Sequence, residues 1–208
     1  MRFHRQAFPV SVIATALLAC ANPADDKPEA KVGDAIEATK QAVSGTRFTF
    51  DDTSTLGFVG SKVTGSHQGG FRTFSGAITV PGTDLTKASV EVDIDATTLW
   101  ADNEKLTGHL KSPDFFDVAT YPTARFESTS ISADLEGFTL TGNLTLHGVT
   151  KSVSFPAAIS MTESGVRATA EFVIQRFDFG IAYKGKADDL IRDEVVIQVD
   201  LSASPVHT

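Results

Sequence analysis

The sequence contains one cysteine, one tryptophan, two tyrosines and two methionines among its 208 residues. The single cysteine, Cys20, excludes an intramolecular disulfide and any cysteine-rich metal site. The five histidines form no H-E-x-x-H or H-x-x-x-H pair, so the sequence predicts neither a metal site nor a cofactor. The chain also lacks a G-x-S-x-G nucleophile motif, a P-loop and a G-x-G-x-x-G motif. We therefore predict that the protein is not an enzyme.

Positive charge is scarce as well, since 18 lysines and arginines stand against 26 aspartates and glutamates, a formal net charge of −8. No basic block occurs, and this excludes a nucleic acid as partner. Phenylalanine, in contrast, is abundant, with 15 residues. Its ring buries apolar area without a polar group that needs a partner, so this composition favours a dry interior.

The N-terminus has the pattern of an export signal. Arg2 and Arg5 precede an almost uncharged stretch over residues 7–19, which is too short to span a bilayer as an anchor. The residues Leu17-Leu18-Ala19-Cys20 resemble a bacterial lipobox. This resemblance implies that residues 1–19 are a lipoprotein signal peptide and that Cys20 is acylated and attaches the chain to a membrane. The alternative is an ordinary cleavage site beside a free cysteine.

The residues after Cys20 suggest both a location and a linker. Ala21 stands where an aspartate would favour retention in the inner membrane, so we expect an exported, periplasmic protein that is lipid-anchored at the outer membrane. Residues 20–45 are rich in Ala, Asp, Glu, Lys and Pro and contain no aromatic residue. Such a segment buries too little apolar area to order itself, so it is predicted to be a flexible tether.

From residue 46 onward, apolar residues recur with a period of two. Val195, Ile197 and Val199, for example, alternate with Gln198 and Asp200. Half-buried antiparallel strands produce this alternation, and residues 46–208 are therefore predicted to form one mainly β domain, a barrel or a sandwich. The expected strands cover residues 46–51, 55–64, 70–80, 86–96, 123–132, 137–146, 149–160, 165–176 and 193–203.

One helix interrupts the strands. Asp102 is expected to cap a helix over residues 103–111, and Pro113 ends it. The adjacent Phe115 and Phe116 follow. In a barrel, this helix and loop would form a plug or lid at one mouth, or a surface helix that covers the end.

Histidines and one arginine are the remaining polar candidates. His67 is placed in a loop, His109 on the helix and His147 in a hairpin turn, each with a structural or solvent role. Arg176 shares the inward parity of the neighbouring apolar residues, and a buried cation is costly unless it is paired. It either forms an ion pair with Asp178, the favoured interpretation, or contacts an anionic ligand head group.

Taken in order, four motifs resemble those of the YceI-like family. They are His67-x-x-Gly70-Phe71-x-x-Phe74-x-Gly76; His109-Leu110-Lys111-Ser112-Pro113-Asp114-Phe115-Phe116-Asp117 with Tyr121-Pro122 and Phe126-x-Ser128; Gly142-x-Leu144-Thr145-x-x-Gly148-Val149-Thr150; and Arg176-x-Asp178-Phe179-Gly180. The resemblance implies a lipocalin-like antiparallel β-barrel of about eight strands, with the short helix and loop insertion near one mouth, that binds a polyisoprenoid in the periplasm. The chain departs from the family at residues 103–108, where an Arg-Asp pair is common, which leaves the ligand's head group open.

We therefore expect the barrel to bind, sequester or transport a polyisoprenoid or a similar long-chain amphipathic lipid. At about −0.3 kcal/mol per heavy atom, a ligand of roughly 40 atoms reaches about −12 kcal/mol, which is nanomolar binding. The expected ligand-binding residues, for each of which ordinary core packing is the alternative, are Phe58, Phe71, Phe74, Leu106, Leu110, Phe115, Phe116, Phe126, Leu144, Phe172, Ile174, Arg176 and Phe179.

Two other functions stay open at this point. A non-catalytic structural or stress-related interaction lipoprotein would have a packed barrel, and an enzyme acting on a lipid would use His67 or His109 as acid or base. The sequence does not decide the oligomeric state, for which a homodimer is one option.

Overall fold

The computed structural model describes residues 22–37 and 43–206. The signal peptide and the lipidation site predicted at residues 1–20 lie outside these residues. Over these described residues strands dominate, with one α-helix, α1 (Glu104–Lys111), and three 3-10 helices, η1 (Leu85–Lys87), η2 (Ala96–Thr98) and η3 (Arg176–Phe179). The strands are β1 (Lys31–Asp34), β2 (Thr46–Phe50), β3 (Thr55–Lys62), β4 (Gly65–Phe71), β5 (Phe74–Val80), β6 (Ser89–Asp95), β7 (Leu99–Ala101), β8 (Thr123–Ala133), β9 (Phe138–Leu146), β10 (Val149–Thr162), β11 (Gly165–Gln175), β12 (Gly185–Lys186) and β13 (Asp189–Pro205).

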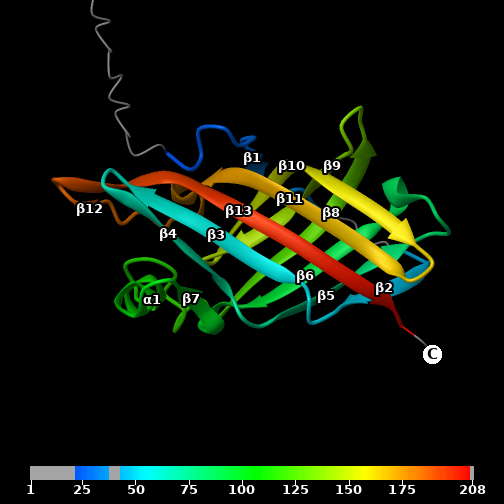
Figure 1. Cartoon of the computed structure of the whole chain (residues 1–208), viewed down its shortest axis with the longest axis horizontal. Coiled ribbons are helices and arrows are strands. Elements are labelled where there is room, and N and C mark those ends of the chain that lie inside the picture. Colours follow the sequence, from blue (N-terminus) through cyan, green and yellow to red (C-terminus); the bar gives the residue numbers. More distant parts are fainter. Residues whose placement is uncertain (1–21, 38–42, 207–208) are drawn as a thin grey trace, which may run out of the picture.

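Eight of these strands close into an antiparallel barrel. The ring runs β2–β5–β6–β8–β9–β10–β11–β13 and returns to β2. The helix α1 and the short strand β12 lie at one end of the barrel, and the C-terminus lies at the other (Figure 1). The predicted mainly β barrel of about eight strands is confirmed.

The 17-residue strand β13 is long enough to pair with two shorter strands in succession along one edge. It pairs with β3 over Ile191–Asp200 and with β2 over Ala203–Pro205. The strands on the far side of β3 and β2 are divided at the same place, because β4 pairs with β3 and β5 pairs with β2. The expected single strand over 70–80 is therefore wrong. The chain bends at residues 72–73, where the backbone N–H groups of Arg72 and Thr73 donate to Thr98.

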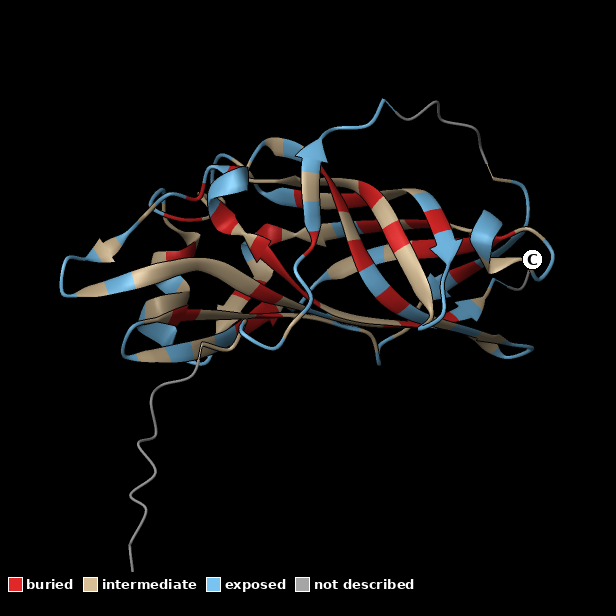
Figure 2. Ribbon diagram, turned by 90° about the horizontal axis from the view of Figure 1, so that it is seen from above, coloured by how far each residue is buried: buried red, intermediate tan, exposed pale blue. Residues whose placement is uncertain are grey.

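The alternating pattern places one face of each strand inside. Buried positions recur along the barrel strands in the ribbon coloured by burial (Figure 2). The largest fully buried side chains include Ile78 and Val80 on β5, Val153 on β10 and Val166 on β11. A second, smaller apolar cluster joins Phe58, Leu99, Leu110, Phe115 and Ile181 at the end that carries α1, which we call the α1 end.

The helix begins one residue later than expected. Asn103, and not Asp102, is its N-cap, because the Asn103 Oδ1 accepts a hydrogen bond from the backbone N–H of Leu106. Ser112 is the C-cap, next to Pro113, as predicted. The helix contacts β7, and the loop that follows places Phe115 and Phe116 against the apolar cluster at the α1 end. The insertion therefore covers this end of the barrel.

Residues 28–34, part of the segment predicted to be a flexible tether, are instead packed against the barrel wall. Strands β10 and β11 pair only over Ala158–Thr162 with Gly165–Thr169, and beyond this they separate. Residues 28–34 fill the gap, since β1 pairs with β10 and the backbones of Pro28 and Ala30 hydrogen-bond to Val173 of β11. The amino-acid composition did not indicate this packing, because backbone hydrogen bonds, not large apolar side chains, hold the segment in place.

Two side-chain contacts reinforce this N-terminal segment. Lys27 forms an ion pair with Glu171 on β11, which holds the pKa of that carboxyl below its usual value. Ala30 is buried, and Val32 packs against the main core. The segment is thus part of the barrel wall over residues 28–34. Among the described residues, no helix combines the length and apolar character needed to cross a bilayer.

We expect removal of residues 22–37 to destabilise the barrel by on the order of 2–4 kcal/mol, because buried apolar area and several backbone hydrogen bonds are lost together. Urea unfolding of the shortened chain measures this change. Hydrogen exchange of the Val173 amide, which donates to Pro28 in the intact chain, should accelerate. The exposed Asp34→Ala is the control and should leave both readouts unchanged. An unaltered unfolding midpoint in the shortened chain would contradict a role for this segment in the wall.

Candidate functional site

A cavity of about 390 Å³ runs inside the barrel. Its lining extends from Leu106 and Phe116 at the α1 end to Leu85 and Ala88 beside η1. Nearly all of the lining is apolar, and its volume lies within the range of about 300–1,000 Å³ that is usual for small-molecule sites. The barrel interior is therefore hollow, and its walls offer very few hydrogen bonds.

Most of the predicted ligand-binding residues line this cavity. They are Phe58, Phe71, Leu106, Leu110, Phe115, Phe116, Phe126, Leu144, Phe172, Ile174 and Arg176. Two predicted residues do not line it. The Phe74 ring lies against Phe50, with ring centroids 6.4 Å apart, and Phe179 in η3 is fully buried in the core. For these two the prediction of a position on the cavity wall was wrong, because parity gives the face of a strand but not which inward side chain reaches free space.

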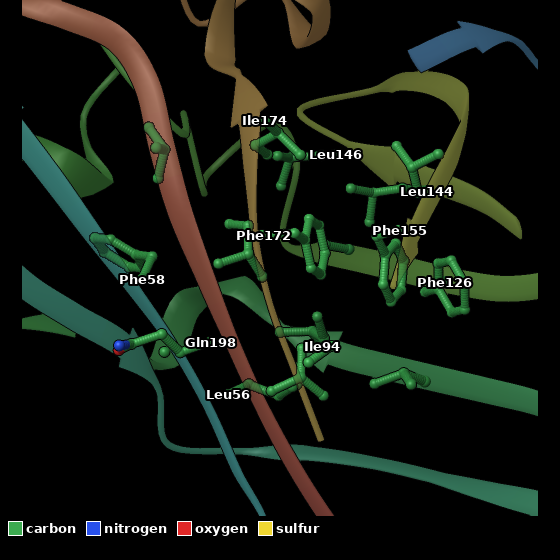
Figure 3. A pocket seen from close by; sticks show the side chains of 18 of the residues that line it. Leu56, Phe58, Ile94, Phe126, Leu144, Leu146, Phe155, Phe172, Ile174 and Gln198 are labelled. Atoms are coloured by element: carbon green, nitrogen blue, oxygen red, sulfur yellow. The ribbon is translucent and has the colours of Figure 1, made fainter. Parts of the chain in front are cut away.

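Other lining residues were missed, although the same alternation contained them. Phe155 on β10 shares the inward parity of Val153, and its ring stacks on Phe172 at 3.9 Å between centroids. The ring of Phe126 lies next, 5.8 Å from Phe155. These three rings, from β8, β10 and β11, lie side by side on the cavity wall (Figure 3). They form an aromatic surface in the middle of the barrel.

A glycine makes room for this surface. A Cβ on Gly142 would lie 2.5 Å from the ring of Phe126 and 2.5 Å from the backbone oxygen of Glu127. Gly142 lies on β9, and only a residue without a side chain fits there against the β8 backbone and the Phe126 ring. A second group of aromatic rings lies at the α1 end, where the ring centroids of Phe58, Phe71 and Phe116 are 6.0–6.3 Å apart.

Arg176 lies on the cavity wall at the α1 end, but its predicted ion pair with Asp178 is not formed. Its Nε donates to the carbonyl oxygen of Arg192 at 2.9 Å, its Nη1 to Ile181 at 2.5 Å and its Nη2 to Ile191 at 3.3 Å. Two of these carbonyls belong to an irregular stretch of β13, where pairing with β3 shifts between Ile191 and Val195. The shift turns backbone oxygens toward the arginine, which the sequence alone does not reveal.

Two other polar residues that line the cavity have side-chain partners of their own. Lys62 lines the cavity and forms an ion pair with Asp189. Gln198, although among the lining residues, donates through its Nε2 to Glu171, and Figure 3 shows its amide turned away from the three rings. The lysine and the arginines that line the cavity, Lys62, Arg176 and Arg192, thus lie at the α1 end.

The histidines divide between the rim and a turn. His67 was expected in a loop but lies in β4, where its Nδ1 is 2.8 Å from Asp102 Oδ1. The other Asp102 oxygen accepts the N–H of Gln68, and this bond is the main cause that lowers the pKa of the carboxyl. His109 lies on α1, 3.0 Å from Asp114, and His147 occupies the β9–β10 turn with positive φ, as expected. Within residues 22–37 and 43–206, no group of three or more His, Cys, Asp or Glu side chains is placed to hold a metal ion.

Comparison with known proteins identifies relatives of this barrel. A family model described as the YceI-like domain matches residues 48–203. A UPF0312 protein of Pseudomonas putida is 31% identical over 140 residues, which cover 63% of this chain and 72% of the relative. The protein YceI of Escherichia coli is 37% identical over 91 residues, which cover 44% of this chain and 48% of the relative.

Solved structures share the architecture. BcnA of Burkholderia cenocepacia superposes with a TM-score of 0.65 at 23% identity, over 74% of this chain and 99% of that one. A polyisoprenoid binding domain from Saccharophagus degradans, implicated in plant cell wall breakdown, superposes with a TM-score of 0.63 at 18% identity, over 78% of this chain and all of that one. At these identities the likeness establishes the fold.

Proposed function

The chain belongs to the YceI-like domain family, and on this premise we propose that its barrel binds a polyisoprenoid or a similar long-chain amphipathic lipid and sequesters or transports it. The observation that carries the proposal is the apolar cavity of about 390 Å³ along the barrel. A hydrocarbon tail needs a dry, elongated space and no hydrogen bonds, and the cavity wall offers this. The polyisoprenoid binding domain from Saccharophagus degradans, a protein of the same fold, adds support.

A packed barrel that acts only as an interaction module is the weaker alternative. Such a barrel would fill its interior with side chains, as small eight-stranded barrels can. The cavity beside Phe126, Phe155 and Phe172 argues against this packing. An empty apolar cavity lowers the stability of the fold, and a bound lipid would restore contacts with its walls. The cavity therefore favours binding.

We propose further that the protein is not an enzyme. The His67–Asp102 pair beside the cavity meets one condition for an acid–base site, because a histidine there contacts a carboxylate. The same carboxylate accepts the Gln68 N–H, and the Asp102 N–H donates to the Gln68 carbonyl oxygen. These bonds fasten the chain between β7 and α1 to β4, which gives the pair a structural role.

For the location, we propose a periplasmic protein that is anchored through acylated Cys20 in the outer membrane. The first described residue, Asn22, lies beside Ser61 at the α1 end, with 3.4 Å between the Asn22 Oδ1 and the Ser61 Oγ. An anchor there would hold the polar end of the cavity next to the bilayer from which a lipid is taken or to which it is delivered.

Mass spectrometry of an organic extract of the purified protein tests lipid binding. We expect one prenyl or other long-chain lipid per protein, since nanomolar binding survives purification. The same protein after passage over a hydrophobic resin in mild denaturant, then refolded, is the control and should give an empty extract. An empty extract from the untreated protein, together with no binding of added prenyl lipids, would overturn the proposal.

A further inference from the structure

Lysine and arginine side chains line the apolar cavity at one end only. Lys62, Arg176 and Arg192 all line the cavity, and all three lie at the α1 end, where β3, η3 and the start of β13 come together. Lys62 is compensated by Asp189. The two arginines are in a different situation.

Arg176 is 4% exposed, and backbone carbonyls accept three of its five N–H donors. The carbonyl oxygens and the Phe177 ring, whose centroid lies 4.5 Å from the guanidinium, carry no net charge, so the cation has no anionic partner in direct contact. Among the described residues, no carboxylate lies within ion-pair distance of it. Asp193 acts on it from farther away, and its own carboxylate accepts the N–H of Phe177. Burial lowers the pKa of Arg176, and Asp193 opposes this change.

Arg192 provides an independent observation. Its Nε is buried and has no hydrogen-bond partner, and in residues 22–37 and 43–206 no other buried side-chain nitrogen or oxygen lacks one. Buried donors are almost always paired in native proteins, so an orphan donor on a cavity wall indicates an acceptor that occupies the cavity. The nearby backbone carbonyl of Arg192 is already used by Arg176.

We propose that Arg176 and Arg192 bind the head group of the lipid and that this head group is an oxyanion, namely a phosphate, a diphosphate or a carboxylate. The inference rests on the proposed function and adds the chemical class of the ligand to it. An oxyanion offers acceptors to the Arg192 Nε and to the free donors of Arg176, and its charge offsets the buried cation. The tail would then extend from the α1 end past the Phe126–Phe155–Phe172 rings toward η1.

A neutral head group fits this end less well. The carbonyl of a quinone or the hydroxyl of a prenol would accept one hydrogen bond but would leave the charge of Arg176 uncompensated in an apolar cavity. The two classes therefore differ in affinity for the same tail. Ligands with one tail and different head groups separate them.

The test uses the full chain, freed of lipid, and three ligands with one C20 tail: geranylgeraniol, geranylgeranyl phosphate and geranylgeranoic acid. We expect the phosphate and the carboxylate to bind about ten- to a hundredfold more tightly than the alcohol, which is the usual range for a charge-assisted hydrogen bond. Arg192→Gln should reduce this preference at least about tenfold and leave the affinity for the alcohol unchanged. Arg176→Lys, which keeps the charge but loses the planar fork, should reduce it less.

Arg167→Gln is the matched control, because Arg167 is an exposed β11 arginine that pairs with Asp200 away from the cavity. It should leave all three affinities unchanged. Equal binding of the three ligands by the unaltered chain, or an equal loss for all three in Arg192→Gln, would overturn the head-group site while lipid binding stands. Failure of all three to bind the unaltered chain would overturn the proposed function as well.

Discussion

Ala170→Trp should abolish most of the affinity for a prenyl tail. Ala170 lies on β11 on the cavity wall, two residues from Phe172, so an indole at this position projects into the free space. The ring brings about nine additional atoms, and at about −0.3 kcal/mol per displaced ligand atom the loss is about 2.7 kcal/mol, close to a hundredfold in Kd. Competition against a fluorescent prenyl probe measures this change. The affinity of Ala170→Leu should fall between those of the unaltered protein and of Ala170→Trp.

The matched control is Ala158→Trp. Ala158 is an exposed residue of β10, where the same substitution adds the ring to the outer face of the wall. Its effect on Kd should stay within about threefold. Thermal unfolding of both lipid-free variants checks that overpacking, which costs typically about 1–3 kcal/mol, has not unfolded the barrel. Unchanged affinity in a folded Ala170→Trp would show that the tail does not occupy the lumen.

Phe179→Ala should destabilise the protein by about 3–5 kcal/mol, because the ring is fully buried in the core and its removal leaves a cavity that the neighbours cannot fill. For a domain of this size the unfolding midpoint should fall by about 6–20 °C. Because Phe179 does not line the cavity, lipid affinity measured well below that midpoint should change by less than about threefold. Calorimetry of the lipid-free protein and the prenyl probe give the two readouts.

Phe177→Ala is the control from the same 3-10 helix. Its ring is 41% exposed and contacts the guanidinium of Arg176 at 4.5 Å, so its removal should cost about 0.5–1 kcal/mol. The pair thus separates a core phenylalanine from a surface one within three residues. A large loss of lipid affinity in Phe179→Ala, with stability intact, would instead return Phe179 to the ligand site and contradict its place in the core.

The candidate site was predictable as a set of inward faces but not as a cavity. The alternation on β11 indicated Phe172 and Ile174, and both line the cavity. The same reasoning placed Phe179 with them, although the chain leaves the strand at Arg176 and enters a 3-10 helix. Whether an inward ring faces free space or other side chains depends on residues from distant strands, and a single sequence does not specify these neighbours.

The environment of Arg176 was likewise only partly predictable from the sequence. Its parity indicated a buried cation, and it is buried. Its partners could not be inferred, because they are carbonyl oxygens of residues 181, 191 and 192 that a loop and a β-bulge bring to it. Sequence reasoning counts side chains as candidate partners, and it therefore chose Asp178.

By itself, the sequence determined the period-two strands, the helix before Pro113 and the dry, phenylalanine-rich character of the interior, because these properties depend on residues near one another in the chain. Only the tertiary structure decided that the barrel is hollow, that residues 28–34 complete its wall and that two arginines meet the cavity at one end. These features arise where segments far apart in the chain meet. There, backbone hydrogen bonds and leftover space, rather than side-chain type, set the outcome.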